Sequence, residues 1–435
     1  MLNPNQIRVE ELINYFNYNY PSPIGAHPFS ISTEVAACPW NPANRLLHIG
    51  IKGKEVHERE LPSSNLVFLI DVSGSMTNPD KLPLLQKAFH MLTNQLRSKD
   101  RIAMVVYAGA SGVVLPSTSG ANKAKILEAL YQLEAGGSTA GATGLELAYQ
   151  VAERHFIKDG NNRVILATDG DFNVGPSSEE ELVQLIEKKR ASGVYLSVLG
   201  FGIETSGDQR MEQLADNGNG QFAYIDNLNE ARKVMIQQMS GTLLTIAKDV
   251  KLQLEFNPAH VASYRLIGYE NRMLKKEDFN NDQKDAGDIG AGHTVTALYE
   301  IVPTGDQRVA TAEGDLKYQA QVVKASAKAD PDLLTMKLRY KKPNASTSQL
   351  LEYTARDGGS TFGESSENFR FSAAVASFGM LLRNSDFKGS SNFTDISQWA
   401  SGSKGKDSFG HRKEFLQLVE WAETIHKEQD GPVAY

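Results

Sequence analysis

The sequence predicts an α/β protein whose centre is a doubly wound, mainly parallel β-sheet. Between about residues 65 and 239, short apolar β-rich runs alternate with amphipathic helical stretches, and several of these runs are continuously apolar. A continuous apolar run is typical of a strand that helices cover on both faces, whereas a half-exposed strand alternates apolar and polar residues. Strand–helix alternation over this length indicates a parallel sheet with helices on both faces.

The individual elements follow from the local patterns. Leu66–Ile70 reads as a buried strand, and the apolar residues from Leu85 to Leu96 recur at helical spacing. The predicted strands cover residues 66–70, 102–107, 163–168, 195–199 and 221–225. The predicted helices cover residues 85–96, 124–133, 144–155, 179–190, 209–215 and 230–239.

The segments on either side of the α/β region show a period of two. Residues 250–256 and 334–340 alternate apolar and polar side chains, and so do residues 29–35 and 47–51. This pattern predicts strands that are buried on one face only. Because such segments occur on both sides, we expect one β-sandwich into which the α/β domain is inserted. Two independent β segments that flank the domain are the alternative.

These patterns divide the chain into four parts. A short helix over residues 3–16 and β segments occupy residues 1–62, and the α/β domain occupies residues 63–246. Residues 247–345 form the other part of the β-sandwich, and residues 346–435 form a C-terminal helical region. Two helical stripes support that region. They are Phe371, Ala374, Val375, Phe378 and Leu382, and Phe415, Leu418, Val419, Ala422 and Ile425.

The composition argues against several functional classes. The chain has 435 residues, with 45 Lys and Arg against 52 Asp and Glu, which gives a net charge of −7. It therefore lacks the excess of basic residues that is typical of a nucleic-acid-binding protein. Its apolar runs are far shorter than the roughly 20 residues that span a bilayer. The one cysteine, Cys38, excludes an intramolecular disulfide and reads as a small buried apolar residue.

A cluster of oxygen-bearing side chains follows the first predicted strand of the α/β domain. The sequence there is Asp71-Val72-Ser73-Gly74-Ser75. In doubly wound sheets the carboxyl ends of the strands face the ligand crevice, so these side chains point toward a site. Oxygen ligands of this kind suit a hard cation such as Mg²⁺ or Mn²⁺. A Ser/Gly turn that simply leads into a helix is the alternative for this motif alone.

Two further loops strengthen the metal interpretation. Thr139 lies in the Gly-rich loop 136–141, before a predicted helix, and Asp169 follows the predicted strand 163–168. Because the carboxyl ends of parallel strands lie at one edge of the sheet, we expect these side chains to lie near Asp71.

Together, Asp71, Ser73, Ser75, Thr139 and Asp169 resemble the metal-ion-dependent adhesion site of von Willebrand factor type A (VWA) domains. The resemblance implies a Rossmann-like fold. It implies that Ser73, Ser75 and Thr139 bind the metal directly, and that Asp71 and Asp169 hold it partly through ordered water. The implied metal is Mg²⁺, with Mn²⁺ or Ca²⁺ as alternatives.

The segments outside the α/β domain carry a second resemblance, to bacterial and often exported VWA proteins. Residues 33–42, 278–282 and 292–300 carry it. It implies a periplasmic or cell-envelope protein. No signal peptide is visible at the start of the sequence, so the chain either lacks its leader or belongs to a cytoplasmic protein.

The expected function is protein binding rather than catalysis. A divalent cation held mainly by neutral hydroxyls keeps much of its charge and favours an additional carboxylate, which an Asp or Glu of a partner protein would supply. One alternative is an envelope scaffold in which the metal only stabilises the fold. A Mg²⁺-dependent phosphohydrolase is the other, although such enzymes generally need a second carboxylate two residues after the first, where this chain has Ser73.

A second metal motif begins at Asp278. The series Asp278, Asn280 and Asp282 starts like an EF-hand loop, but Gln283 and Ile289 stand where that loop needs Gly and Glu. We therefore expect a polar loop, with a Ca²⁺ site as the alternative.

Overall fold

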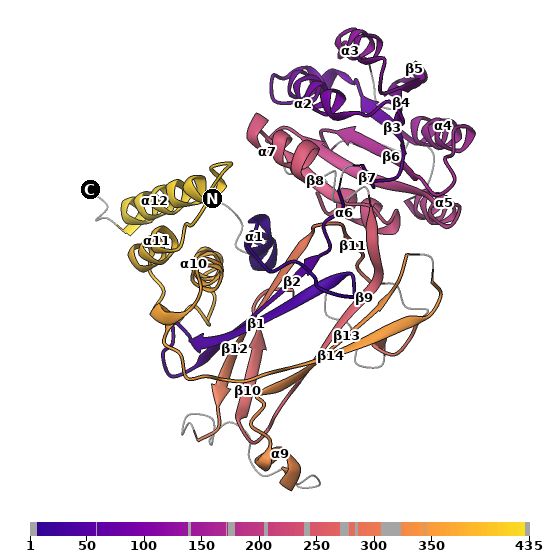
Figure 1. Ribbon diagram of the computed structural model, residues 1–435. Coiled ribbons are helices and arrows are strands. Elements are labelled where there is room, and N and C mark those ends of the chain that lie inside the picture. Colours follow the sequence, from indigo (N-terminus) through magenta and orange to yellow (C-terminus); the bar gives the residue numbers. More distant parts are fainter. Residues whose placement is uncertain are drawn as a thin grey trace. The chain divides into compact units, whose positions relative to one another are not determined.

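The structure is a computed structural model in which the chain forms two compact units (Figure 1). Residues 55–245 form one unit, and residues 1–54 and 246–435 together form the other. The structure describes residues 7–57, 59–137, 141–170, 172, 179–203, 208–238, 244–269, 278–282, 286–305, 323–343 and 345–430.

The unit of residues 55–245 is built on a six-stranded sheet with the order β5-β4-β3-β6-β7-β8. Neighbouring strands from β4 to β8 pair in parallel, whereas the edge strand β5 pairs antiparallel with β4. This topology confirms the predicted doubly wound sheet. The strands are β3 (Ser64–Asp71), β4 (Arg101–Ala108), β5 (Ala110–Ser119), β6 (Asn161–Thr168), β7 (Val194–Phe201) and β8 (Phe222–Ile225). The helices are η2 (Gly74–Thr77), α2 (Leu82–Gln95), α3 (Lys123–Tyr131), α4 (Gly141–Arg154), α5 (Glu179–Ala191), α6 (Asp208–Asn217), α7 (Leu228–Arg232) and η3 (Lys233–Gln238).

Helices cover both faces of this sheet (Figure 1). Leu66, Phe68 and Ile70 of β3 belong to the core that includes residues of α2, α3 and α7. Val67 and Leu69 belong to the core on the other face, which includes residues of α4, α5 and α6. Because every residue of β3 is buried, its sequence is apolar without alternation.

Two details of this unit differ from the predicted elements. The edge strand β5 was not anticipated, because its pairing with β4 contains register irregularities and its apolar residues do not alternate. The helix predicted over residues 230–239 consists of a short α-helix, α7, that continues as the π-helix η3 from Lys233.

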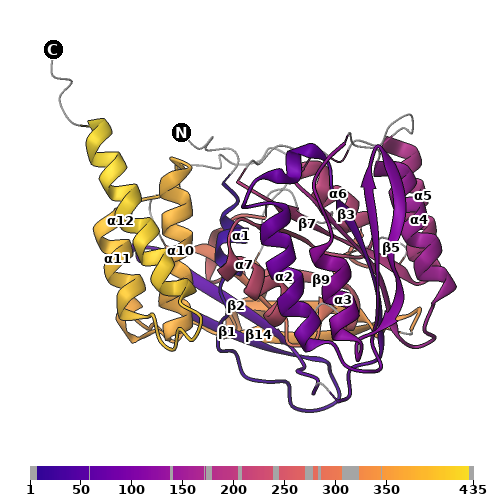
Figure 2. The ribbon, with the colours of Figure 1, turned by 90° about the horizontal axis from the view of Figure 1, so that it is seen from above.

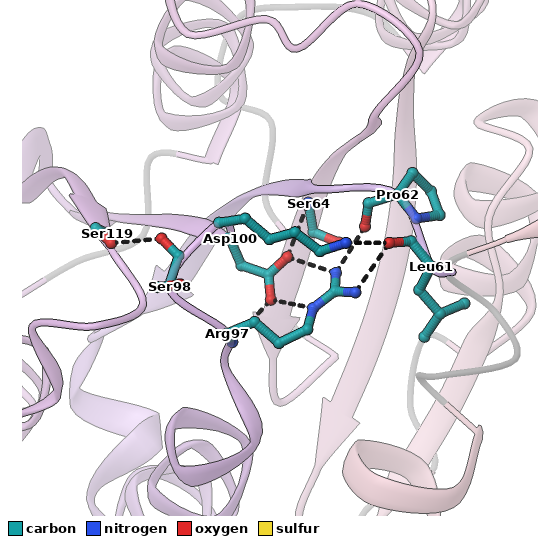
Figure 3. A network of polar contacts seen from close by, with 8 residues as sticks. Leu61, Pro62, Ser64, Arg97, Ser98, Asp100 and Ser119 are labelled. Carbon is teal, nitrogen blue, oxygen red and sulfur yellow. Dashed lines mark hydrogen bonds and ion pairs between the residues drawn. The ribbon is translucent and has the colours of Figure 1, made fainter. Parts of the chain in front are cut away.

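An ion-pair network fixes the chain where it enters β3 (Figure 3). Arg97 pairs with Asp100 at 2.6 Å, and its guanidinium also donates to the backbone carbonyls of Leu61 (2.9 Å) and Pro62 (2.6 Å). The carboxylate of Asp100 accepts the backbone N–H of Ser64, the first residue of β3, at 3.0 Å. The network therefore ties the incoming segment and the start of the central strand to the loop between α2 and β4.

The unit of residues 1–54 and 246–435 contains two four-stranded sheets that share one hydrophobic core. Their strand orders are β1-β2-β12-β10 and β11-β9-β13-β14. Strand β2 pairs antiparallel with β12, which lies beyond the α/β unit in sequence, so the flanking β segments are not independent. The strands are β1 (Phe29–Ala37), β2 (Arg45–Gly53), β9 (Thr245–Phe256), β10 (Val261–Leu266), β11 (Ile289–Gly290), β12 (Thr294–Pro303), β13 (Leu334–Lys341) and β14 (Ser348–Ala355).

Helices from both chain ends share a second core in this unit. Helices α10, α11 and α12 lie side by side in both views (Figures 1 and 2), and α1 packs against α10. The segment 346–435 is not entirely helical as expected, because β14 pairs antiparallel with β13 before the helices begin. Residues 1–6 of the predicted N-terminal helix lie outside the described residues. The helices are α1 (Val9–Tyr15), α9 (Ala325–Ala329), η6 (Phe362–Glu364), α10 (Glu367–Leu382), α11 (Phe393–Gly402) and α12 (His411–Asp430).

Within the described parts of the chain, no helix has both the length and the apolar character that crossing a bilayer requires.

Candidate metal centre

Asp71 occupies the carboxyl end of β3, between β4 and β6, and is completely buried (0% exposed). Its Oδ1 accepts the backbone N–H of Ser73 at 2.8 Å. Its Oδ2 accepts the hydroxyl groups of Tyr107 (3.2 Å) and Thr168 (3.3 Å), which belong to the two neighbouring strands. These hydrogen bonds hold the carboxylate at the edge of the sheet where ligands bind in doubly wound folds.

The two serines of the motif lie directly after this strand. Ser73 is 3% exposed and precedes the 3-10 helix η2, whereas Ser75 lies within η2 and is exposed. Their Oγ atoms are 3.0 Å apart. The turn therefore brings the two hydroxyl groups together beside Asp71, as the two-residue spacing predicts.

The Gly-rich loop contacts the same turn through its backbone. The N–H of Gly74 donates to the carbonyl of Gly137 (3.2 Å), and the N–H of Gly136 donates to the carbonyl of Val72 (2.7 Å). Gly137 has φ of +92°, a conformation that favours glycine. Thr139, the third expected hydroxyl ligand, lies outside the described residues.

Asp169 lies at the carboxyl end of the neighbouring strand β6 and forms a buried ion pair with Lys81. Lys81 Nζ lies 2.9 Å from Asp169 Oδ2, and the side chains are 5% and 2% exposed, respectively. Lys81 is not among the residues that the sequence predicts for this site. No motif marks it, because a lysine directly before an apolar helix reads as a solvated surface residue.

The electrostatics of the cluster favour an additional cation. Burial raises the pKa of the Asp71 carboxyl, the hydrogen bond from the Ser73 N–H opposes this rise, and the negative charge of Asp169 adds to it. With both acids ionised, Asp71, Asp169 and Lys81 together carry one excess negative charge. Because an uncompensated buried charge is costly, a cation bound here would relieve that cost.

The donor atoms fit a hard divalent cation. Asp71, Ser73, Ser75 and Asp169 offer only oxygen atoms, which is the ligand chemistry of Mg²⁺, Mn²⁺ and Ca²⁺. Within the described ranges there is no group of three or more His, Cys, Asp or Glu that could hold a metal ion. A metal in this cluster would therefore depend on serine and threonine hydroxyls in addition to the two carboxylates.

The EF-hand-like segment is held by lysine instead. Lys251 Nζ donates to the backbone carbonyls of Asp278 (3.1 Å) and Asn281 (2.5 Å), and Lys341 Nζ donates to the carbonyl of Asp282 (2.7 Å). Arg339 also lies 3.1 Å from Asp282 Oδ1, a carboxylate oxygen that an EF-hand loop would offer to Ca²⁺. The contacts support the interpretation of this segment as a polar loop.

Three family models match the chain. The von Willebrand factor type A domain model matches residues 65–238, and the model for the C-terminal part of the uncharacterized protein YfbK matches residues 241–425. A third model, described as von Willebrand factor, matches residues 1–48.

The chain is also similar to individual proteins and to solved structures. The chain is similar to the von Willebrand factor type A protein of Catenulispora acidiphila, with a TM-score of 0.45, 16% identity and coverage of 93% of this chain and 91% of that one. The uncharacterized protein sll0103 of Synechocystis is 31% identical over 51% of each chain. The uncharacterized protein YfbK of Escherichia coli K12 is 45% identical over 432 residues, which cover 97% of this chain and 74% of YfbK. The chain therefore belongs to the YfbK family of VWA-domain proteins.

Proposed function

We propose that this protein binds a partner protein through a divalent cation. Asp71, Ser73, Ser75, Thr139 and Asp169 would hold the ion, with Mg²⁺ as the first candidate and Mn²⁺ or Ca²⁺ as alternatives. The observation that carries the proposal is the buried carboxylate of Asp71 beside the paired hydroxyls of Ser73 and Ser75, at the ligand-binding edge of a VWA sheet.

The chemistry of the ligand set suggests what the partner contributes. Serine and threonine hydroxyls are neutral, so a divalent cation that they hold keeps much of its positive charge. A carboxylate from an Asp or Glu of the partner is the ligand that best compensates this charge. VWA-domain proteins are mostly non-enzymatic interaction modules, which agrees with a binding function.

Affinity capture tests the proposal directly. The full chain is immobilised, and native lysate is passed over it in Mg²⁺ and again in EDTA, with bound proteins identified by mass spectrometry. We expect partners that bind in Mg²⁺ and are lost both in EDTA and with Asp71→Ala. Glu153→Ala is the matched control, because it removes an acid from an exposed ion pair with Lys189 on α5 and leaves the metal ligands intact.

A competition step tests the carboxylate itself. A soluble peptide that contains the partner's acidic residue should displace the captured partner, and the same peptide with the amide residue in its place should not. Capture that persists unchanged in EDTA, or with Asp71→Ala, would refute the proposal. Mg²⁺-dependent thermal stabilisation without any Mg²⁺-dependent capture would instead favour a structural metal.

We also propose a periplasmic or cell-envelope location. The resemblance of the flanking segments to exported bacterial VWA proteins supports this location. Cell fractionation of the native organism, with an antibody against the chain, would test it. Recovery of the protein with the cytoplasmic fraction would contradict it.

A further inference from the structure

A lysine ammonium lies inside the candidate metal centre. Lys81 Nζ is 2.9 Å from Asp169 Oδ2, and both side chains are almost fully buried. Lysine is rarely buried unless it is paired, because removing its charge from water is costly. The contact is therefore part of the construction of the site and not a chance approach of a surface side chain.

The surrounding backbone accommodates the lysine stem. The carbonyl of Lys81 accepts the N–H of Leu85 at 2.8 Å, which fixes the lysine at the start of α2. Its side chain passes Gly202, which follows β7, and a Cβ atom added at Gly202 would lie 3.1 Å from Lys81 Cε. Gly202 has φ of +112°, where glycine is favoured, so the room beside the lysine depends on this glycine.

The location of the charge also requires a compensating acid. A positive side chain at the N-terminus of a helix is disfavoured by the helix dipole, and Lys81 directly precedes the 14-residue helix α2. Asp169 supplies the nearby negative charge that offsets both the dipole and the burial. The same carboxylate is one of the proposed metal ligands.

We propose that Lys81 is an internal counter-cation that holds Asp169 when no metal is bound and competes with the divalent cation for it. The inference rests on the proposed function. A divalent cation bound by Asp169 would lie close to the Lys81 ammonium, and like charges at that separation in a buried site repel strongly. Lys81 therefore lowers the affinity of the site for metal and keeps Asp169 paired in the metal-free protein.

Titration of the full chain with Mn²⁺ after chelator treatment, followed by calorimetry, measures this competition. Lys81→Met removes the ammonium, and Lys81→Gln removes the charge but keeps a hydrogen-bond donor for Asp169. We expect both variants to bind Mn²⁺ about tenfold more tightly than the wild type, or better. Lys189→Met is the matched control, because it also removes a lysine paired with a carboxylate in this unit and should bind Mn²⁺ as the wild type does.

Thermal unfolding without metal identifies the variants that fold. If Lys81→Met does not fold, the Mn²⁺ affinity of Lys81→Gln alone tests the competition. Wild-type affinity or weaker in folded Lys81→Gln overturns the competition. If the wild type binds Mn²⁺ and Asp71→Ala abolishes this binding, the proposed metal function nevertheless stands. If none of the folded proteins binds Mn²⁺, both the competition and the proposed function fail. If Lys81→Gln binds Mn²⁺ and the wild type does not, Lys81 excludes the metal from the site completely, which also supports the competition.

Discussion

Replacement of Asp71 by asparagine separates metal binding from folding. The amide has the shape of the carboxylate, so its oxygen can still accept the Ser73 N–H now held at 2.8 Å. Its NH₂ group would face the hydroxyls of Tyr107 and Thr168, which can rotate to become acceptors. Burial raises the pKa of the Asp71 carboxyl, which means that its charged form is costly in the metal-free fold. In EDTA, we therefore expect the free energy of unfolding of Asp71→Asn to lie within about 1 kcal/mol of the wild-type value, or above it.

Added Mg²⁺ should distinguish the two proteins. A ligand that binds only the folded state stabilises it by about 2.7 kcal/mol when its concentration is 100 times its dissociation constant. The wild type should gain about this much, whereas Asp71→Asn should gain almost nothing, because the amide cannot supply the negative charge that a divalent cation requires.

The positions of the tryptophans allow the two units to be followed separately. Trp40, Trp399 and Trp421 all lie in the unit of residues 1–54 and 246–435. Urea unfolding followed by tryptophan fluorescence therefore reports on the unit without the metal site and serves as an internal control. Hydrogen exchange of β3 and β6 reports on the unit with the metal site. A Mg²⁺-induced gain in stability of Asp71→Asn equal to that of the wild type would show that the Asp71 carboxylate is not a metal ligand. A loss of more than about 3 kcal/mol in EDTA would show that the amide does not fit.

Two further predictions concern stability. Asp100→Ala leaves the Arg97 guanidinium and the Ser64 N–H without their shared acceptor. The free energy of unfolding of the α/β unit, measured by hydrogen exchange in urea, should fall by about 3–5 kcal/mol. A loss below about 1 kcal/mol would contradict this prediction. Burial lowers the pKa of His48, which contacts Tyr20, from 6.5 to about 4. Between these pH values the unfolded chain binds a proton at His48 and the folded chain does not. The contribution of His48 to stability is therefore complete above pH 6.5 and falls by about 3 kcal/mol toward pH 4. His48→Gln should remove this part of the acid sensitivity in urea titrations at several pH values, and an unchanged pH profile would contradict the assignment.

The sequence was most informative where the burial pattern is regular. The strand 66–70 is apolar throughout because helices cover both of its faces, and the structure extends it only to Ser64–Asp71. The segment 29–35 alternates because one face of β1 packs in the shared β core. The segment 47–51 also forms a strand, β2, but the prediction that it is buried on one face only is wrong. Leu47, Ile49 and Ile51 pack in the β core, and His48 and Gly50 between them are buried as well. Elements with no regular period were missed. Strand β5 is an edge strand with irregular pairing, so its residues do not alternate between core and solvent.

The candidate site shows a similar division. The spacing of Asp71, Ser73 and Ser75 identified a converging turn, because residues two apart after a strand share one sheet edge. The loop around Gly136 was placed correctly beside that turn. Lys81 was not predicted, because its role comes from a tertiary contact with Asp169 that no local pattern encodes.

Anomalous diffraction from crystals grown with Mn²⁺ would locate the metal ion relative to its proposed ligands. We predict one strong anomalous peak within bonding distance of the Ser73 and Ser75 hydroxyls, at the carboxyl end of β3 and beside Asp169. The same crystals should show whether Lys81 Nζ has moved away from Asp169. A protein that takes up no Mn²⁺, or a peak that lies away from these side chains, would contradict the proposed metal centre.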